Sequence, residues 1–301
     1  MKLVFVSSLL LAFGGVFAAL ADELKMERRV LSDGAAAKAW SQSEATMESS
    51  TDVVKTGGPS LHWRVTVDHH AGEPKYPIGW PRVSLALKGG ARDWSAWDYF
   101  HFWIRMSTSR KELPRVPAVL NILQGTAGKT APFMLILSDL KKDRWLEVRI
   151  PVAKLAVAKD VHMLQFNIAE DQYHHQDTLD FYIDDFALLR HATPALVDFT
   201  AVNAVMFSDA RSVPASFMLS GIPAGEPRRV TLELRQAGAV IAAGDYTTVR
   251  GTQRLALDVS KAALKPGDYD LAGSVEGGVV VLSRVRVVAS PWQQARIKKI
   301  P

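Results

Sequence analysis

The sequence contains no cysteine among its 301 residues, and this absence excludes several kinds of chemistry. Disulfide bonds, thiolate zinc sites and cysteine nucleophiles are all impossible without a thiol. The folded protein must therefore be held together by burial of apolar surface, and 48% of the residues are hydrophobic.

Over most of its length the chain also has no excess of positive over negative side chains, or the reverse. The formal net charge is +5, but residues 22–190 hold 22 basic and 22 acidic side chains, and residues 191–301 hold 13 and 9. Three of the latter basic side chains lie in the tail, at Arg296, Lys298 and Lys299. Because no basic stripe is interleaved with aromatic residues, we expect no nucleic-acid partner.

Long apolar runs are rare, and only the first residues contain one. The run covers residues 3–20 and follows Lys2, and the small-residue motif Ala19-Leu20-Ala21 stands at its end, directly before Asp22. This pattern predicts a signal peptide over residues 1–21, and a membrane anchor is the alternative. With no second run of that length, we expect a secreted or periplasmic protein without a membrane span after cleavage.

Helical periodicity is nearly absent, since only residues 151–158 look helical. Short alternating segments separated by turns predict instead an all-β protein built from antiparallel sandwiches or barrels. The composition changes near Pro194, after which no tryptophan occurs until Trp292. We therefore predict one domain over residues 22–190, a smaller one over residues 194–290, and a tail or linker over residues 291–301.

The chain is organised around residues 93–106, which hold three tryptophans and then alternate strictly. Two residues per repeat indicate a β-strand with one apolar face and one aromatic-polar face. Extending the alternation to the other segments predicts a sandwich core formed by Phe100, Phe102, Leu120, Ile122, Leu146, Val148, Leu164, Phe166, Ile183 and Leu189.

The opposite face is the candidate ligand site. A pyranose offers apolar C–H patches to aromatic rings and hydroxyl groups to amides, arginine or carboxylates. The candidate contacts are Tyr99, His101, Trp103, Arg105, Asn121, Gln165, Asn167 and Tyr182. An ordinary solvated sheet face alternates in the same way, and Tyr76, Trp80 and Tyr173 offer an alternative site in loops.

Three motifs in order resemble a known family. They are residues 93–98 leading into Phe102-Trp103-Ile104, residues 145–151, and residues 181–186, and the segment 58–63 also fits. Together they are similar to the galactose-binding-like β-sandwich, the jelly roll of many carbohydrate-binding modules, over roughly residues 25–190. The resemblance implies two antiparallel sheets and sugar bound on a concave face or in end loops.

The same resemblance implies a structural calcium ion as cofactor. The matching carboxylates are Asp33 near the first strand and Asp184 or Asp185 in the last one. Calcium takes several oxygen ligands, which carboxylates from two ends of a domain can supply. The alternative is that Asp33 caps a turn with Gly34 and Asp185 accepts backbone hydrogen bonds.

The second domain resembles bacterial immunoglobulin-like or fibronectin-like accessory domains through the segment 264–269, Leu-Lys-Pro-Gly-Asp-Tyr. Strand candidates of regular length and spacing agree with a small sandwich of that kind. The resemblance implies a spacer rather than a catalytic unit.

Two histidine pairs, His69-His70 and His174-His175, lie in polar segments beside Asp68 and Asp177. Imidazole and carboxylate suit a transition metal if the two loops share one end of the sandwich. Because nothing in the sequence brings the loops together, we expect solvated loop histidines.

Motifs for catalysis are absent: the sequence has no nucleophile elbow, phosphate loop or His-Glu-x-x-His helix. We therefore predict a non-enzymatic, exported protein that binds a poly- or oligosaccharide. Two alternatives are the accessory region of a longer secreted glycoside hydrolase, and an envelope structural or adhesion protein without a sugar site.

Overall fold

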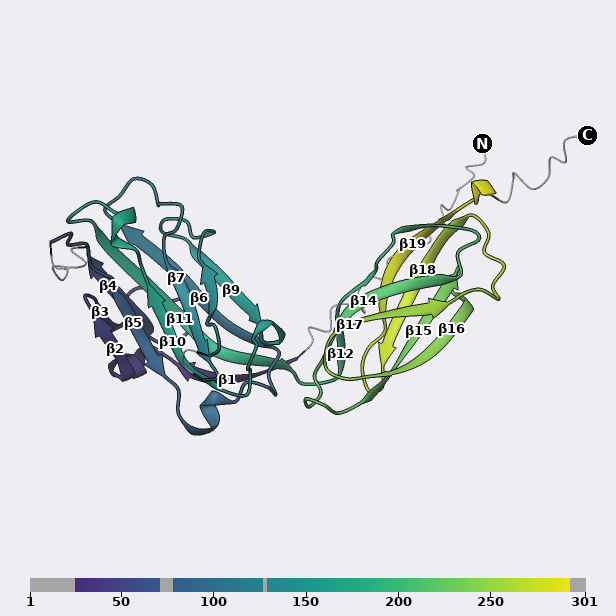
Figure 1. The fold of residues 1–301 in the computed structure, drawn as a ribbon, viewed down its shortest axis with the longest axis horizontal. Coiled ribbons are helices and arrows are strands. Elements are labelled where there is room, and N and C mark those ends of the chain that lie inside the picture. The colour runs from purple at the N-terminus through teal and green to yellow at the C-terminus, as the bar shows by residue number, and fades with distance from the viewer. Residues whose placement is uncertain (1–24, 71–77, 127–128, 293–301) are drawn as a thin grey trace, which may run out of the picture.

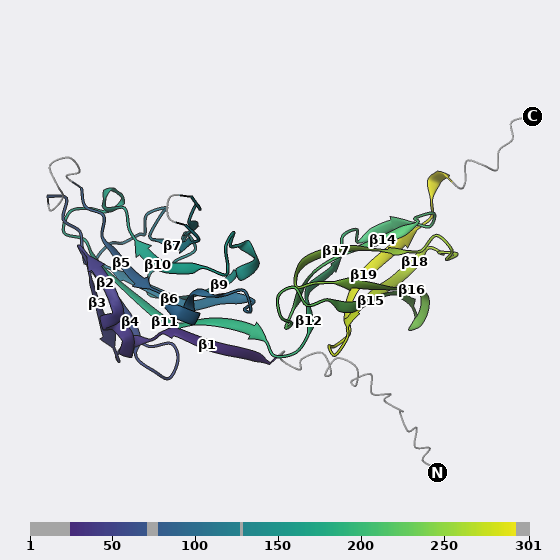
Figure 2. The same ribbon diagram turned by 60° about the horizontal axis from the view of Figure 1, so that its bottom comes forward.

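The computed structural model describes residues 25–70, 78–126 and 129–292, which form two β-sandwiches arranged end to end (Figures 1 and 2). The prediction of an all-β sandwich protein is confirmed. The predicted signal peptide and most of the predicted tail lie outside the described residues. In the part that is described, no helix is both long and apolar enough to cross a membrane.

Two sheets face each other in the first sandwich. One has the strand order β3-β4-β11-β6-β9, with β1 paired to β11, and we call it the β6 sheet. Its strands are β1 (Met26–Ser32), β3 (Thr46–Ser50), β4 (Ser60–Thr66), β6 (Tyr99–Thr108), β9 (Trp145–Pro151) and β11 (Thr178–His191).

The other sheet has the order β2-β5-β10-β7-β8, and we call it the β10 sheet. Its strands are β2 (Trp40–Ser43), β5 (Arg82–Ala86), β7 (Val119–Gln124), β8 (Phe133–Ile136) and β10 (Val161–Asn167). All pairings within the two sheets are antiparallel, and most join strands that are distant in sequence.

The second sandwich packs a sheet ordered β12-β14-β17 against a sheet ordered β13-β19-β18-β15-β16. The short strand β13 pairs in parallel with β19, whereas the other pairings are antiparallel. The strands are β12 (Ala195–Ala201), β13 (Val205–Phe207), β14 (Ser212–Ser220), β15 (Arg228–Gln236), β16 (Ala239–Thr248), β17 (Gly251–Asp258), β18 (Gly267–Val275) and β19 (Val281–Val288).

Among the described residues of the two sandwiches, helical structure is limited to short 3-10 turns: η1 (Gly34–Ala39), η2 (Gly89–Arg92), η3 (Val152–Lys154) and η4 (Glu170–Gln172). The expected helix over residues 151–158 was wrong, because Pro151 still belongs to β9 and Leu155 is already extended. A segment this short gains too few hydrogen bonds to offset the cost of nucleating an α-helix.

The core between the two sheets of the first sandwich is rich in aromatic rings. Trp63 stacks on Phe181 with ring centroids 4.3 Å apart, and Phe166 from the β10 sheet lies 5.6 Å from Phe102 of the β6 sheet. The residues expected in the core are buried there, except that Leu146 is only partly buried. Leu189 is buried outside this cluster, beside Tyr99.

The position of Leu189 follows from a β-bulge in β11. The register with β6 shifts between Asp184 and Ala187, and Asp185 has a positive φ of 54°. An extra residue in one strand reverses the inward and outward sense of every position after it. Alternation counted across the bulge therefore assigned Leu189 to the wrong face.

The segment between the sandwiches, residues 192–194, is packed closely against the second one. A Cβ at Gly221, where φ is +73°, would lie 2.0 Å from the Thr193 carbonyl oxygen. A Cβ at Gly278 would lie 2.3 Å from the Pro194 carbonyl oxygen. Only glycine allows the backbone of residues 193–194 to pass this close to the second sandwich, so the connecting segment is short and tightly packed against it.

Candidate functional site

The eight predicted ligand contacts do not form one face. Five of them lie on the outer side of the β6 sheet, and the other three, Asn121, Gln165 and Asn167, lie on the outer side of the β10 sheet. The whole core separates the two groups. Alternation identifies the outward positions of a strand but not the sheet to which the strand belongs, so the two faces were combined in error.

Two of the predicted contacts on the β6 sheet, Tyr99 and His101, are buried rather than available to a ligand. Tyr99 is 8% exposed, and its burial raises its pKa to about 12. His101 is 3% exposed and lies 3.1 Å from a carboxylate oxygen on each side, at Glu147 and Asp185. Both side chains are therefore enclosed by neighbouring residues, and a ligand cannot reach them.

The remaining side chains of that face are engaged with neighbours. The ammonium group of Lys55 lies 4.3 Å from the centroid of the Trp103 ring, and Tyr182 stacks on His62 at 4.5 Å. The Arg105 guanidinium lies 3.4 Å from an oxygen of Asp143. The outer face of the β6 sheet thus carries a network of ion pairs and ring contacts, with little aromatic surface left for a sugar.

The three carboxylates of the predicted calcium site do line one cavity of about 400 Å³, together with Arg28 and the loop at residues 56–59. Their oxygens, however, already have partners. Asp184 accepts hydrogen bonds from the Lys55 and Thr56 amides, at 2.7 and 3.0 Å, and from the Thr56 hydroxyl at 2.6 Å. Asp33 caps η1 through the amide of Ala36.

Asp185 is engaged by the Arg28 guanidinium and by the His101 ring. Burial alone would raise its pKa, but the contact with His101 and the charge of Arg28 outweigh burial and hold the pKa below its ordinary value. In residues 25–70, 78–126 and 129–292, no group of three or more acidic or histidine side chains is arranged to hold a metal ion. This donor set does not fit calcium in the observed arrangement.

Calcium binding accordingly stays a prediction of the resemblance, and thermal denaturation tests it. If the ion is structural, calcium added after EDTA treatment should raise the melting temperature by several degrees, because a ligand that binds only the folded state stabilises it. Equal melting temperatures with EDTA and with calcium would contradict it. In Asp184→Asn, which removes the charge of one predicted ligand, the calcium-dependent rise in melting temperature should disappear.

The outer face of the β10 sheet has a different character. Ser41, Ser84, Gln165 and Asn121 lie in register on four adjacent strands, and we call them the polar row. Asn167 follows Gln165 two residues later on β10 and points to the same side. Its side-chain oxygen accepts a 2.7 Å hydrogen bond from the Asn121 side-chain amide. At about 4.8 Å per strand, the polar row spans about 14 Å.

The polar row keeps unused hydrogen-bonding capacity. The Gln165 amide donates to the Ser84 hydroxyl at 3.1 Å, and the Ser41 hydroxyl donates to the Ser84 carbonyl oxygen at 3.2 Å. An amide has two N–H donors and an oxygen acceptor, so these bonds leave the oxygen of the partly exposed Gln165 side chain for a ligand. Ser84 and Asn167 are only 7% and 8% exposed, so their role is to hold the Gln165 and Asn121 amides in place.

Apolar and aromatic side chains border the polar row. Trp80 is 50% exposed. The guanidinium of Arg82 lies 5.0 Å from the centroid of the Trp80 ring, and Arg82 pairs with Asn167 in the sheet. On the other side, Met134 pairs with Asn121 and is 61% exposed. This face combines amides, hydroxyls, one arginine and one exposed indole.

The three aromatic residues of the alternative loop site differ in their exposure. Trp80 is exposed beside the polar row, whereas Tyr173 is 2% exposed and donates its hydroxyl to the Pro117 carbonyl oxygen at 2.6 Å. Tyr76 lies outside the described residues. Sequence reasoning missed Ser41, Ser84 and Arg82 because these residues alternate with apolar ones but contain no aromatic ring to draw attention.

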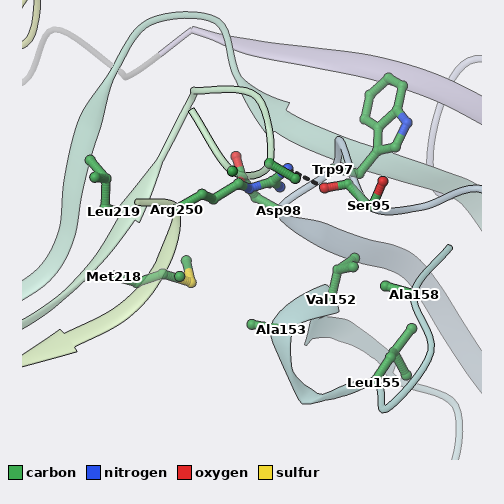
Figure 3. Close-up of a pocket in the computed structure, with 13 residues that line it drawn as sticks. Ser95, Trp97, Asp98, Val152, Ala153, Leu155, Ala158, Met218, Leu219 and Arg250 are labelled. Carbon is green, nitrogen blue, oxygen red and sulfur yellow. Dashed lines mark hydrogen bonds and ion pairs between the residues drawn. The ribbon is translucent and has the colours of Figure 1, made fainter. Parts of the chain in front are cut away.

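A pocket of about 200 Å³ lies between the two sandwiches (Figure 3). Arg250, just before β17, reaches across it and donates to the Ser95 carbonyl oxygen and to Asp98, each at 2.6 Å. The second Asp98 oxygen accepts the backbone N–H of His191 at 2.8 Å. The rest of the lining is mainly apolar and includes Val152, Ala153, Leu155, Ala158, Met218 and Leu219.

The polar groups of this pocket satisfy one another. The Asp98 side chain is 2% exposed and that of Arg250 is 10% exposed, so the ion pair is buried between the sandwiches. Next to it, burial lowers the pKa of His191 and favours a neutral imidazole. We interpret the pocket as part of a fitted junction rather than as a sugar site.

Comparisons with known proteins give similarity in structure only. No family model matches the sequence, and no curated protein matches it either. A β-1,2-glucanase from Parabacteroides distasonis is 14% identical with a TM-score of 0.37, covering 90% of this chain and 38% of the glucanase chain.

Two further solved structures are similar at the same low level. An Endo-D glycoside hydrolase domain from Streptococcus pneumoniae R6 is 12% identical with a TM-score of 0.31, covering 82% of this chain and 37% of that one. A glycosyl hydrolase family 2 member from Bacteroides cellulosilyticus is 8% identical with a TM-score of 0.25, covering 68% and 28%. This chain therefore spans well under half the length of these three solved chains, and their activities are not transferred to it.

Proposed function

We propose that the protein is an exported, non-catalytic carbohydrate-binding protein that holds a neutral poly- or oligosaccharide on the outer face of the β10 sheet. The contacts are Ser41, Gln165 and Asn121 of the polar row, together with Arg82 and Trp80, whereas the buried Ser84 and Asn167 position the amides. The proposal concerns a binding module and applies equally to a chain that acts alone and to part of a longer enzyme.

The observation that carries the proposal is the polar row itself. Amide and hydroxyl groups from four strands lie in register on one outer face, and they are paired with one another rather than with charges. Such groups match sugar hydroxyls, which both donate and accept hydrogen bonds. The exposed Trp80 ring supplies the flat apolar surface on which the C–H face of a sugar can lie.

The β6 sheet is the less suitable face for a sugar. Its outward groups are mostly charged and already paired, as with Asp180, which contacts both His62 and Arg64 at 2.7 Å. A ligand there would have to displace ion pairs before forming its own hydrogen bonds, which costs free energy. The first hypothesis thus keeps its ligand class but is restricted to one of the two faces.

Substitution in the polar row tests the proposal. A glycan array and affinity electrophoresis against a panel of neutral polysaccharides would first identify a ligand. We expect Asn121→Ala and Gln165→Ala each to weaken binding about 3- to 10-fold, since one hydrogen bond contributes about 0.5–1.5 kcal/mol. Trp80→Ala should weaken binding by a similar factor through loss of ring contact.

Two control variants make the result specific. Gln253→Ala removes a partly exposed amide from the second sandwich, and Trp103→Ala removes an aromatic ring from the β6 sheet. Both should bind like the wild-type protein. Loss of binding in Trp103→Ala with unchanged binding in Asn121→Ala would place the site on the β6 sheet, and absence of any glycan binding would support the envelope-protein alternative.

A further inference from the structure

The two histidine pairs, which the sequence left unconnected, are brought together by the fold. Their loops leave β4 and lead into β11, and backbone hydrogen bonds join them: Val67 donates to Asp177 at 2.9 Å, and Gln176 donates to Val67 at 2.8 Å. The expectation rested on the absence of anything that would hold the loops together. The structure supplies that connection through the pairing of β4 with β11.

A buried carboxylate strengthens the connection. Glu170 is 3% exposed, and its two oxygens accept the backbone N–H groups of Asp68 at 3.1 Å and Gly79 at 3.0 Å. Its own carbonyl oxygen lies 3.2 Å from Nε2 of His69. The buried carboxylate thus fixes the position of Asp68, which directly precedes the first histidine pair.

Two imidazole rings lie close to that of His175. The ring of His70 lies 4.8 Å from it and the ring of His69 lies 5.8 Å from it, measured between centroids. An oxygen of Asp68 lies 3.6 Å from Nδ1 of His175. Two imidazoles bound to one zinc ion at about 2.0–2.1 Å in tetrahedral geometry have ring centroids about 5 Å apart, which is the separation found here.

The surrounding charges also favour a cation. Asp68, Asp177 and Glu170 lie in or beside the cluster, and the neighbouring cation, Arg110, lies 3.5 Å from Asp177 and donates to the Gln172 carbonyl oxygen. His69 has the arrangement that metal-bound histidines commonly have, with one ring nitrogen held by a backbone carbonyl oxygen and the other left for the metal.

We propose that His175, Asp68 and one or both of His69 and His70 bind a divalent transition-metal ion such as zinc. In the side-chain conformations present, the donor atoms of the described residues do not converge on one point. His70 and His175 are exposed, so their rings can turn about their side-chain bonds toward one ion. In turning, His175 exchanges the hydrogen bonds of its ring nitrogens to the His69 amide and the Gln176 side chain, each at 3.2 Å, for a bond to the metal. Neutral imidazole with carboxylate is a donor set that suits zinc, copper or nickel.

Calorimetric titration of the full chain with zinc chloride, in a buffer that does not chelate, tests the proposal. We expect one zinc ion per chain, released by EDTA, and at least tenfold weaker binding in His175→Ala. At least one of His69→Ala and His70→Ala should weaken binding to a similar degree. His174→Ala is the matched control, because this exposed neighbour of His175 lies outside the cluster, and it should bind zinc like the wild-type protein.

The proposal is overturned if the wild-type protein takes up no zinc, or if His175→Ala binds zinc as tightly as the wild-type protein. It is also overturned if His174→Ala is weakened as much as His175→Ala, since that result indicates chelation by exposed histidines in general. Circular dichroism of each variant excludes misfolding as the cause. The proposal does not rest on sugar binding, so its failure leaves the function proposed for the β10 sheet unaffected.

Discussion

Asp98→Ala is expected to lower the free energy of unfolding by about 3–5 kcal/mol, the usual cost of removing one partner from a buried ion pair. Asp98 accepts from Arg250 at 2.6 Å and from the His191 amide at 2.8 Å, and its side chain is 2% exposed. The substitution removes the counter-charge of Arg250, whose guanidinium keeps only the Ser95 carbonyl oxygen, and it leaves the His191 backbone N–H without its acceptor. Urea denaturation followed by tryptophan fluorescence measures the change, because every tryptophan except Trp292 lies in the first sandwich.

An exposed ion pair provides the matched control. The side chains of Arg92 and Asp160 are 43% and 37% exposed, so Arg92→Ala should cost about 0–1 kcal/mol. In a double-mutant cycle, Asp98→Ala combined with Arg250→Ala should cost less than the sum of the two single changes, because no buried charge is left alone. An effect of Asp98→Ala no larger than that of Arg92→Ala would show that the junction does not depend on this pair.

Phe166→Ala should destabilise the protein by about 3–5 kcal/mol through loss of buried surface and creation of a cavity. The ring is completely buried on β10, and it lies 6.1 Å from Trp40, 6.1 Å from Trp63 and 5.6 Å from Phe102. It therefore links the aromatic side chains of both sheets. Urea denaturation followed by circular dichroism gives the free energy of unfolding.

Phe207→Ala is the control for that experiment. This ring lies on β13 and is 47% exposed, so its removal should change stability by about 0.5 kcal/mol or less. Phe166→Leu should lie between the two, because leucine refills part of the space. Equal stability of Phe166→Ala and Phe207→Ala would contradict the assignment of Phe166 to the centre of the core.

The two proposed sites occupy different parts of the first sandwich and can be tested separately. The polar row lies across the β10 sheet, whereas the histidines lie in loops at the ends of β4 and β11. Variants of Asn121 and His175 therefore address unrelated contacts. Loss of sugar binding in the first and of zinc binding in the second, without cross effects, is the expected result.

Much of the fold could be read from residue order. Strict alternation through Phe100, Phe102 and Ile104 identified a strand and its buried face, because a strand places every second side chain on the same side. Turn residues and the composition change near Pro194 indicated two sandwiches. Alternation and turn residues depend only on neighbouring positions in the chain, so they can be recognised without knowing the tertiary structure.

The candidate site could not be read in the same way. Trp103 and Asn121 have the same kind of outward position in their strands, yet they lie on opposite faces of the sandwich. Likewise, the bulge after Asp184 is set by how β11 pairs with β6, and it changes which residues share a side. Partner strands distant in sequence determine both results, so no single segment contains the information.

The sequence by itself determined that the chain is an all-β protein with an aromatic core and, because it contains no cysteine, that it has no thiol chemistry. Tertiary structure alone decided that Tyr99, His101 and Asn167 are buried, that Asn121 and Gln165 share a separate outer face, and that His69, His70 and His175 meet. The physical reason is that alternation specifies the two sides of a strand, whereas strand pairing specifies what each side faces.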